Sequence, residues 1–238
     1  MTTSGTSTFN LEVTDLIEEA FERCGAELRT GYNLRTARRS MNLLTIEWAN
    51  RGINLWTIEE GSIPLVAGTA TYNLPVDTID LLEHVVRTSP GTSNQTDINI
   101  SRISVSTYSS IPNKTSQGRP IQIYVDRRSG ATDPVSGIQY PTATVWPTPE
   151  NGSAYTLVYW RMRRIQDAGN GTNTQDIPFR LLPCLVAGLA YYLSLKLPEA
   201  MNRIDMLKVA YEEQWMYASG EDREKASVRF VPRDMFYS

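Results

Sequence analysis

The stretch Leu181–Leu197 constrains the fold more than any other part of the chain, because it is apolar on every side of a helical wheel. A helix of this kind must be buried on all sides, either in a protein core or in a membrane. A membrane-spanning helix needs about 20 mostly apolar residues. This run is shorter, contains Pro183, and is bounded by Arg180 and Lys196. We therefore expect a buried central helix in a helical domain, and no membrane association.

Amphipathic helices that can cover this apolar helix are predicted on both sides of it in the sequence. Apolar residues recur three and four positions apart in residues 13–25, 33–50 and 198–220. Thr14 is the expected N-cap of the first helix and Gly25 its C-terminal stop. The expected core of the bundle includes Trp48, Leu185, Leu189, Leu193 and Trp215.

The first two amphipathic helices carry opposite charges on their polar faces. The acidic residues of the first are Asp15, Glu18, Glu19 and Glu22, and the basic residues of the second are Arg35, Arg38 and Arg39. In one interpretation these are solvated faces of a helical hairpin, where exposed ion pairs contribute about 0–1 kcal/mol. In the other they meet across a subunit boundary, because opposite charges on the two sides of a protomer set the register of a head-to-tail ring. Both interpretations stay open.

Between residues 56 and 164 the apolar period changes to two, which predicts short β-strands. Alternation is clear at 121–125, 143–146 and 155–162. The last two segments are expected to form a hairpin through the turn-forming residues 147–152. Tyr159 and Trp160 must lie on opposite faces of their strand, so one of them is a candidate interface anchor outside the core.

Three further strands are predicted earlier in this region. Residues 56–60 and 69–73 bracket a Gly-bounded segment and predict a second hairpin. Residues 82–87 read as another strand. Alternation at 98–100 loses its phase at Ile103, which indicates a bulge or a strand end.

The chain therefore predicts an α+β fold with a β domain inserted into a helical bundle. We expect residues 1–54 and 174–227 to form the bundle and residues 55–173 to form an antiparallel β-sandwich or barrel-like domain. Asp176 is the expected cap of the central helix, and Pro183 either kinks that helix or marks its true start. Residues 228–238 form a separate aromatic and basic arm.

The sequence contains no recognisable motif for catalysis, metal binding or cofactor binding. His84 is the one histidine, and no Gly-x-Ser-x-Gly elbow, phosphate loop or metal-binding motif accompanies it. Glu59 and Glu60 are neighbours on one strand, so their carboxylates point to opposite faces. Cys24 and Cys184 read as buried free thiols of a reducing compartment. We therefore expect no enzyme and no cofactor, although carboxylates scattered in sequence can converge in space.

Six segments are familiar when they are taken together. They are Asn33–Leu44, Glu47–Trp56, Ile111–Pro120, Trp146–Pro149, Ala187–Leu193 and Asp222–Ser227. With these segments and its helix–β–helix order, the chain resembles the head-to-tail adaptors of tailed bacteriophages, especially the tail tubular protein A type of short-tailed phages.

The resemblance implies a structural virion protein of the neck and tail that assembles in the host cytoplasm. Such adaptors form a homo-oligomeric ring, dodecameric in known members, beneath the portal protein. The ring extends the DNA channel and provides the platform for the tail nozzle or tubular protein. A net charge of −3 suits a lumen through which DNA passes without specific binding, because Lys and Arg contacts to phosphate create salt-sensitive adhesion.

Two further interpretations come from the residues themselves. We expect the arm to dock on the portal, with aromatic side chains in pockets and arginines paired with carboxylates; the alternative is that it packs on its own protomer. The residues of this proposed arm contact are Arg229, Phe230, Arg233, Phe236 and Tyr237. The second candidate function is an oligomeric binding module whose β domain recognises carbohydrate or a host surface.

Overall fold

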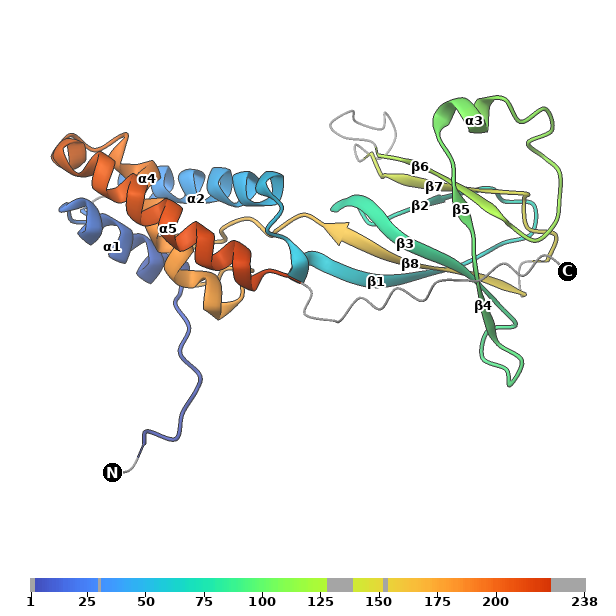
Figure 1. Cartoon of the computed structure of the whole chain (residues 1–238), viewed down its shortest axis with the longest axis horizontal. Helices are drawn as coiled ribbons and strands as arrows, with labels where there is room; N and C mark the ends of the chain where they lie inside the picture. Colours follow the sequence, from blue (N-terminus) through green and yellow to red (C-terminus); the bar gives the residue numbers. More distant parts are fainter. Residues whose placement is uncertain (1–2, 30, 128–138, 152–153, 224–238) are drawn as a thin grey trace, which may run out of the picture. The chain divides into compact units, whose positions relative to one another are not determined.

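The computed structural model describes residues 3–29, 31–127, 139–151 and 154–223, and it has the α+β fold that the sequence predicted (Figure 1). The chain divides into two compact units. The helical unit contains Met1–Leu55 and Asp167–Ser238, and the β unit contains Trp56–Gln166.

The helical unit is built around α4 (Leu182–Ser194), which lies within the apolar stretch of the sequence. The helices around it are α1 (Val13–Cys24), α2 (Gly31–Arg51) and α5 (Ile204–Glu221), with the short 3-10 helices η2 (Phe179–Leu181) and η3 (Pro198–Arg203). Each of α1, α2 and α5 packs against α4. Leu185, Leu189 and Leu193 of α4 are buried, together with Trp48 of α2 and Trp215 of α5.

The closest approach of three helices is at Gly188 in the middle of α4. A Cβ atom added there would lie 2.8 Å from the Tyr211 ring of α5 and 2.9 Å from a methyl group of Leu44 of α2. Glycine is therefore the residue that lets these two large side chains reach the α4 backbone at the same level.

The helix starts differ from the sequence-based expectation at two caps. Glu12, and not Thr14, is the N-cap of α1; its carboxylate accepts from the Asp15 N–H, and the Asp15 carboxylate accepts from the Glu12 N–H at 3.3 Å. The Thr14 hydroxyl instead donates to the Gly171 carbonyl at 3.0 Å. The prediction that Asp176 caps the central helix was also wrong, because the 3-10 helix η2, with Pro178 as its N-cap, precedes α4. Pro183 lies in the first turn of α4 and so marks its start.

The residues that follow the last β-strand are bound to the helical unit. The Ala168 N–H donates to the Asn42 side-chain oxygen at 2.8 Å, and the Asn173 carbonyl accepts from the Val13 N–H at 2.8 Å. Residues 167–173, expected in the β domain, fall in the helical unit. The Asn173 carbonyl satisfies one of the first N–H groups of α1, and the Ala168 N–H is bound by α2.

The chain leaves the helical unit for the β unit beside the end of α5. The Asp222 carboxylate accepts hydrogen bonds from the N–H groups of Asn54 and Leu55, at 2.8 and 3.2 Å. Asp222 is also the C-cap residue of α5. One side chain thus connects the last residue of the final helix with the segment that enters the β unit.

The β unit consists of two four-stranded sheets. The first sheet has the order β1 (Ile58–Pro64), β8 (Tyr155–Arg163), β3 (Thr78–Thr88) and β4 (Thr96–Asn99), with every pair antiparallel. The second has the order β2 (Thr71–Asn73), β7 (Thr142–Trp146), β6 (Gln122–Asp126) and β5 (Ser101–Arg102), in which β5 and β6 are parallel. Two further short helices are η1 (Leu55–Thr57) and α3 (Val105–Ser109), neither of which was predicted from the sequence.

Side chains of both sheets share one buried core. Val86, Leu157 and Tyr159 contribute from the first sheet, and Ile123 and Val145 from the second. Tyr159 is therefore the inward residue of its strand. Trp160, its neighbour, is partly exposed and outside this core, as strand alternation predicted.

Both predicted hairpins are wrong, although their strands exist. β8 pairs with β1 on one side and β3 on the other, so no edge of β8 is left for β7. β1 and β2 likewise lie in different sheets. In each case the turn-forming residues mark a crossing between sheets, because turn chemistry reverses the chain without selecting its partner. The phase change near Ile103 is a strand end, since β5 ends at Arg102.

Candidate functional site

The residues that the sequence offered for catalysis are Glu59, Glu60, His84 and the two cysteines. Within the residues described, no group of three or more His, Cys, Asp or Glu side chains is placed to hold a metal ion. Glu59 forms ion pairs with Arg161, at 2.9 Å, and with Arg163. Burial and the nearby Arg102 charge lower the pKa of His84 on β3.

The two cysteines are separate buried thiols. Cys24 donates to the Ala190 carbonyl at 3.2 Å, which ties α1 to α4. Burial raises the pKa of Cys24 to about 11 and that of Cys184 to about 12. Both thiols are therefore poor nucleophiles at neutral pH. No described helix is both long enough and apolar enough to span a membrane.

The acidic residues of α1 form the rim of a groove of about 700 Å³, which we call the acidic groove. Its apolar wall comes from η2 and α4, where Phe179 is 72% exposed. The residues that line it are Phe9, Leu11, Asp15, Glu18, Glu19, Glu22, Arg23, Phe179, Arg180, Leu182, Pro183 and Val186. The sequence showed the acidic stripe of this groove but not its apolar wall, since the wall comes from distant residues.

Positive charge in the acidic groove is already engaged. Arg23 pairs with Glu19 on the same helix at 2.9 Å. Arg180 lies 4.0 Å from Glu221 of α5. In the described part of the chain, Glu18 and Glu22 form no ion pair, so the groove keeps an excess of negative charge.

The basic residues predicted on α2 do not act alike. Arg35 and Arg39 are exposed and line a hollow of about 220 Å³ with Tyr32 and Thr36. Arg38 is half-buried and donates to the Ala168 carbonyl at 3.3 Å. Arg38 thus fixes the segment that follows the β unit, whereas Arg35 and Arg39 face solvent.

The two charged faces are not neutralised by each other within the protomer. Among the residues that the structure describes, no ion pair joins the α1 carboxylates Asp15, Glu18, Glu19 and Glu22 to Arg35, Arg38 or Arg39. The helical unit therefore presents one acidic face and one basic face to its surroundings.

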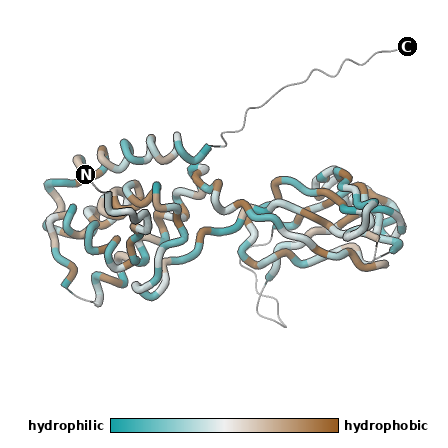
Figure 2. Tube along the Cα trace, turned by 90° about the horizontal axis from the view of Figure 1, so that it is seen from below, coloured by the Kyte–Doolittle hydropathy of each residue, from teal (hydrophilic) through white to brown (hydrophobic). Residues whose placement is uncertain are grey.

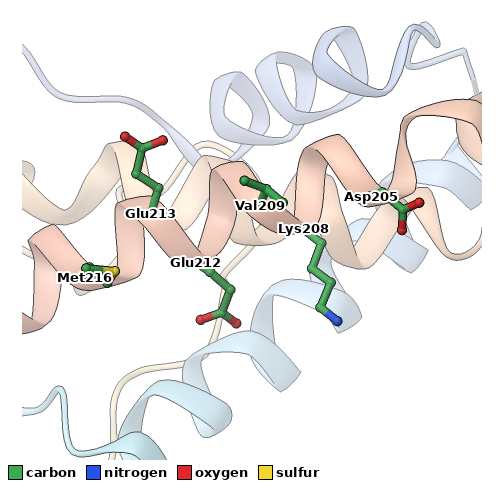
Figure 3. Close-up of a pocket in the computed structure, with 6 residues that line it drawn as sticks. All are labelled: Asp205, Lys208, Val209, Glu212, Glu213 and Met216. Carbon is green, nitrogen blue, oxygen red and sulfur yellow. The ribbon is translucent and has the colours of Figure 1, made fainter.

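A third surface lies on the outward side of α5, and the sequence analysis missed it. Val209 and Met216 are 68% and 71% exposed, and they line a shallow hollow with Asp205, Lys208, Glu212 and Glu213 (Figure 3). The opposite side of α5 is buried through Leu207, Tyr211, Trp215 and Ala218. Hydrophobic and hydrophilic residues accordingly interleave along the chain of the helical unit (Figure 2). The spacing of Met206, Val209 and Met216 at three and seven residues could have revealed this second apolar face.

The proposed docking arm, with Arg229, Phe230, Arg233, Phe236 and Tyr237, lies outside the described residues. Its contacts stay a prediction.

Comparison with known proteins assigns a family to most of the chain. The sequence model of the SU10 adaptor protein family matches residues 12–232, which include both structural units. Comparison with curated proteins gives no match.

Proposed function

The chain belongs to the SU10 adaptor protein family, and from this membership we propose that it is a head-to-tail adaptor that forms a ring beneath the portal. The family is one of structural phage adaptors and not of enzymes. An adaptor of this kind is a component of the virion neck or tail that associates with portal and tail proteins. In our proposal the ring extends the DNA channel and supports the tail nozzle or tubular protein.

The observation that supports a ring most directly is the pair of opposite charged faces on one compact unit. The acidic face belongs to α1 and the basic face, with Arg35 and Arg39, to α2. A contact between two different faces is heterologous, and repetition of a heterologous contact produces either a closed ring or an open filament. We propose a closed ring of twelve subunits, in line with the adaptors that the sequence resembles.

Each part of the chain has a role in this proposal. The helical unit forms the ring, and the β unit faces outward or toward the tail. The arm of residues 228–238 docks on the portal. The net charge of −3 suits a lumen that lets DNA slide, because the chain as a whole does not attract phosphate.

The test is to image the purified protein by negative-stain electron microscopy, alone and mixed with the portal protein of the same phage. We expect rings that stack on one end of the portal. Immunogold labelling of virions should place the protein at the neck. A protein that stays monomeric under both conditions, or that is absent from mature virions, would contradict the proposal. Labelling at the periphery of the tail would favour the alternative of a surface-binding module.

A further inference from the structure

The outward face of α2 is a continuous stripe with apolar residues at both ends and arginines between them. Tyr32, Arg35, Arg39, Leu43 and Ile46 follow one another at intervals of three or four residues, so they lie on one side of the helix. Tyr32, Leu43 and Ile46 are 67%, 51% and 44% exposed. We call these five residues the outer stripe.

The outer stripe is not the face that holds α2 in its own protomer. Ala37, Met41, Leu44 and Trp48 are fully buried. Leu44 lies beside Gly188 of α4, and Trp48 donates to Tyr211 of α5. A helix with apolar residues on two sides has more apolar surface than its own unit covers. Such an exposed apolar seam with charges marks a protein interaction surface.

The acidic groove has the complementary composition. Its apolar wall includes the exposed ring of Phe179, and its rim carries the carboxylates of Glu18 and Glu22. The acidic positions Asp15 to Glu22 cover eight residues of α1, and Tyr32 to Arg39 cover eight residues of α2, which is seven helical steps in each case. Both segments are therefore about 10 Å long. Charge and length therefore match between the acidic positions and the Tyr32–Arg39 part of the outer stripe, without any change of either helix.

We infer that the outer stripe of one copy docks in the acidic groove of the next copy. Tyr32 packs against Phe179, while Arg35 and Arg39 face Glu18 and Glu22. This inference rests on the proposed ring and specifies its subunit contact. The aromatic pair supplies the buried anchor, and the charge pairs set the register and raise the association rate.

The outward face of α5 is the competing partner for the outer stripe, and its charges fit less well. Glu212 is bound by Arg51 of its own protomer at 3.0 Å, and Lys208 stands among the remaining carboxylates. The acidic groove, in contrast, keeps Glu18 and Glu22 outside any ion pair among the described residues. We therefore place the outer stripe of the second copy in the acidic groove, and the α5 face serves as the control surface.

Charge reversal in the full-length protein tests the contact, with oligomer mass measured by native mass spectrometry. One variant carries Arg35→Glu and Arg39→Glu and so loses only the stripe. A second carries Glu18→Lys and Glu22→Lys and so loses only the groove. Each variant alone should assemble at a concentration raised about 100-fold or more. Thermal melting shows that each variant is folded.

Mixing the two variants gives the decisive result. The stripe variant still has a wild-type groove, and the groove variant still has a wild-type stripe. Their mixture should therefore recover assembly with the two variants alternating, because the wild-type stripe meets the wild-type groove at one contact and the reversed stripe meets the reversed groove at the next. The variant with all four reversals should recover assembly, because the reversed charges pair again. Failure of both the mixture and the fourfold variant to recover assembly would overturn the inference.

Truncation of the apolar residues separates this contact from the α5 face. Tyr32→Ala or Phe179→Ala should raise the assembly concentration about tenfold or more. Val209→Ala with Met216→Ala on α5 should leave it unchanged. If the α5 variant disrupts the ring while the stripe and groove variants assemble like wild type, this inference fails but the proposed ring stands. If wild-type protein forms no oligomer, alone or with portal, both fail.

Discussion

The indole N–H of Trp48 donates a hydrogen bond to the hydroxyl oxygen of Tyr211 at 3.1 Å, inside the core of the helical unit. The Tyr211 hydroxyl in turn donates to the Glu47 carboxylate at 3.3 Å. Tyr192 of α4 donates to the other oxygen of Glu47 at 2.6 Å. Three helices of this unit, α2, α4 and α5, thus share one polar network.

Tyr211→Phe should destabilise the helical unit by about 1–3 kcal/mol, because it leaves the buried N–H of Trp48 without an acceptor. Urea denaturation, followed by circular dichroism of the helical signal, measures this loss. Tyr217→Phe is the matched control, since Tyr217 is 64% exposed and its hydroxyl donates to Glu213 on the same helix. Equal stabilities of the two variants would show that the Trp48 bond contributes nothing.

Gly188→Ala should lower the free energy of unfolding by about 1 kcal/mol. The added methyl group gains about 1 kcal/mol of helix propensity. It also collides with Tyr211 and Leu44, and such overpacking costs about 1–3 kcal/mol. Gly220→Ala in α5 gains the same propensity with no atom within 4 Å, so it should stabilise the protein. Thermal melts of both variants check the opposite signs.

Cys24 and Cys184 should resist alkylation in the native protein at pH 8. With a pKa of about 11, only roughly 0.1% of Cys24 is thiolate at that pH, and the thiolate is the reactive form. Mass spectrometry after iodoacetamide treatment should find both cysteines modified only once the protein is unfolded. Met216→Cys adds an exposed thiol as a positive control, because Met216 is 71% exposed. Stoichiometric labelling of the two native cysteines in folded protein would disprove the burial argument.

His84 should make the β unit lose stability as the pH falls below about 6.5. Burial lowers the pKa of His84 in the folded chain, so the unfolded chain binds the proton more tightly. Stability is thus complete above the unfolded pKa and decreases until the folded pKa is passed. Melting temperatures between pH 7.5 and 5 should fall more steeply for wild type than for His84→Gln. Parallel pH profiles would refute the prediction.

A chain that ends at Ser227 should form rings but lose most of its affinity for portal. The deletion removes Phe230, Phe236 and Tyr237, which we expect to fill pockets on the portal, and leaves all of α5 in place. Surface plasmon resonance on immobilised portal measures the change. Unchanged affinity would contradict portal docking. Rings that dissociate after the deletion would place the arm on a neighbouring protomer.

The fold class could be predicted because hydrophobic periodicity is a property of local sequence. The period of 3.6 on both sides of a period-two region predicts helices flanking a β region, and α4 had to be buried because it is apolar on all sides. Gly25 also stops α1 as expected, with a positive φ of 75°. These features need no knowledge of distant partners.

The failures have one physical origin, which is that partner choice is not encoded locally. Turn residues after β7 predicted a hairpin, yet β8 is bounded by β1 and β3. Arg38 looks like its neighbours in sequence, but the Ala168 carbonyl decides its role. The acidic groove needed Phe179 beside α1, a proximity that only the folded chain reveals.

The two hydrogen bonds that Asp222 accepts from Asn54 and Leu55 carry a mechanical implication. Traction on the carboxyl-terminal tail by a bound partner would load this one carboxylate first. The same carboxylate holds Asn54 and Leu55, the residues that immediately precede the β unit. A pulling force on the tail would therefore act on the segment that enters the β unit before it acted on the core of the helical unit.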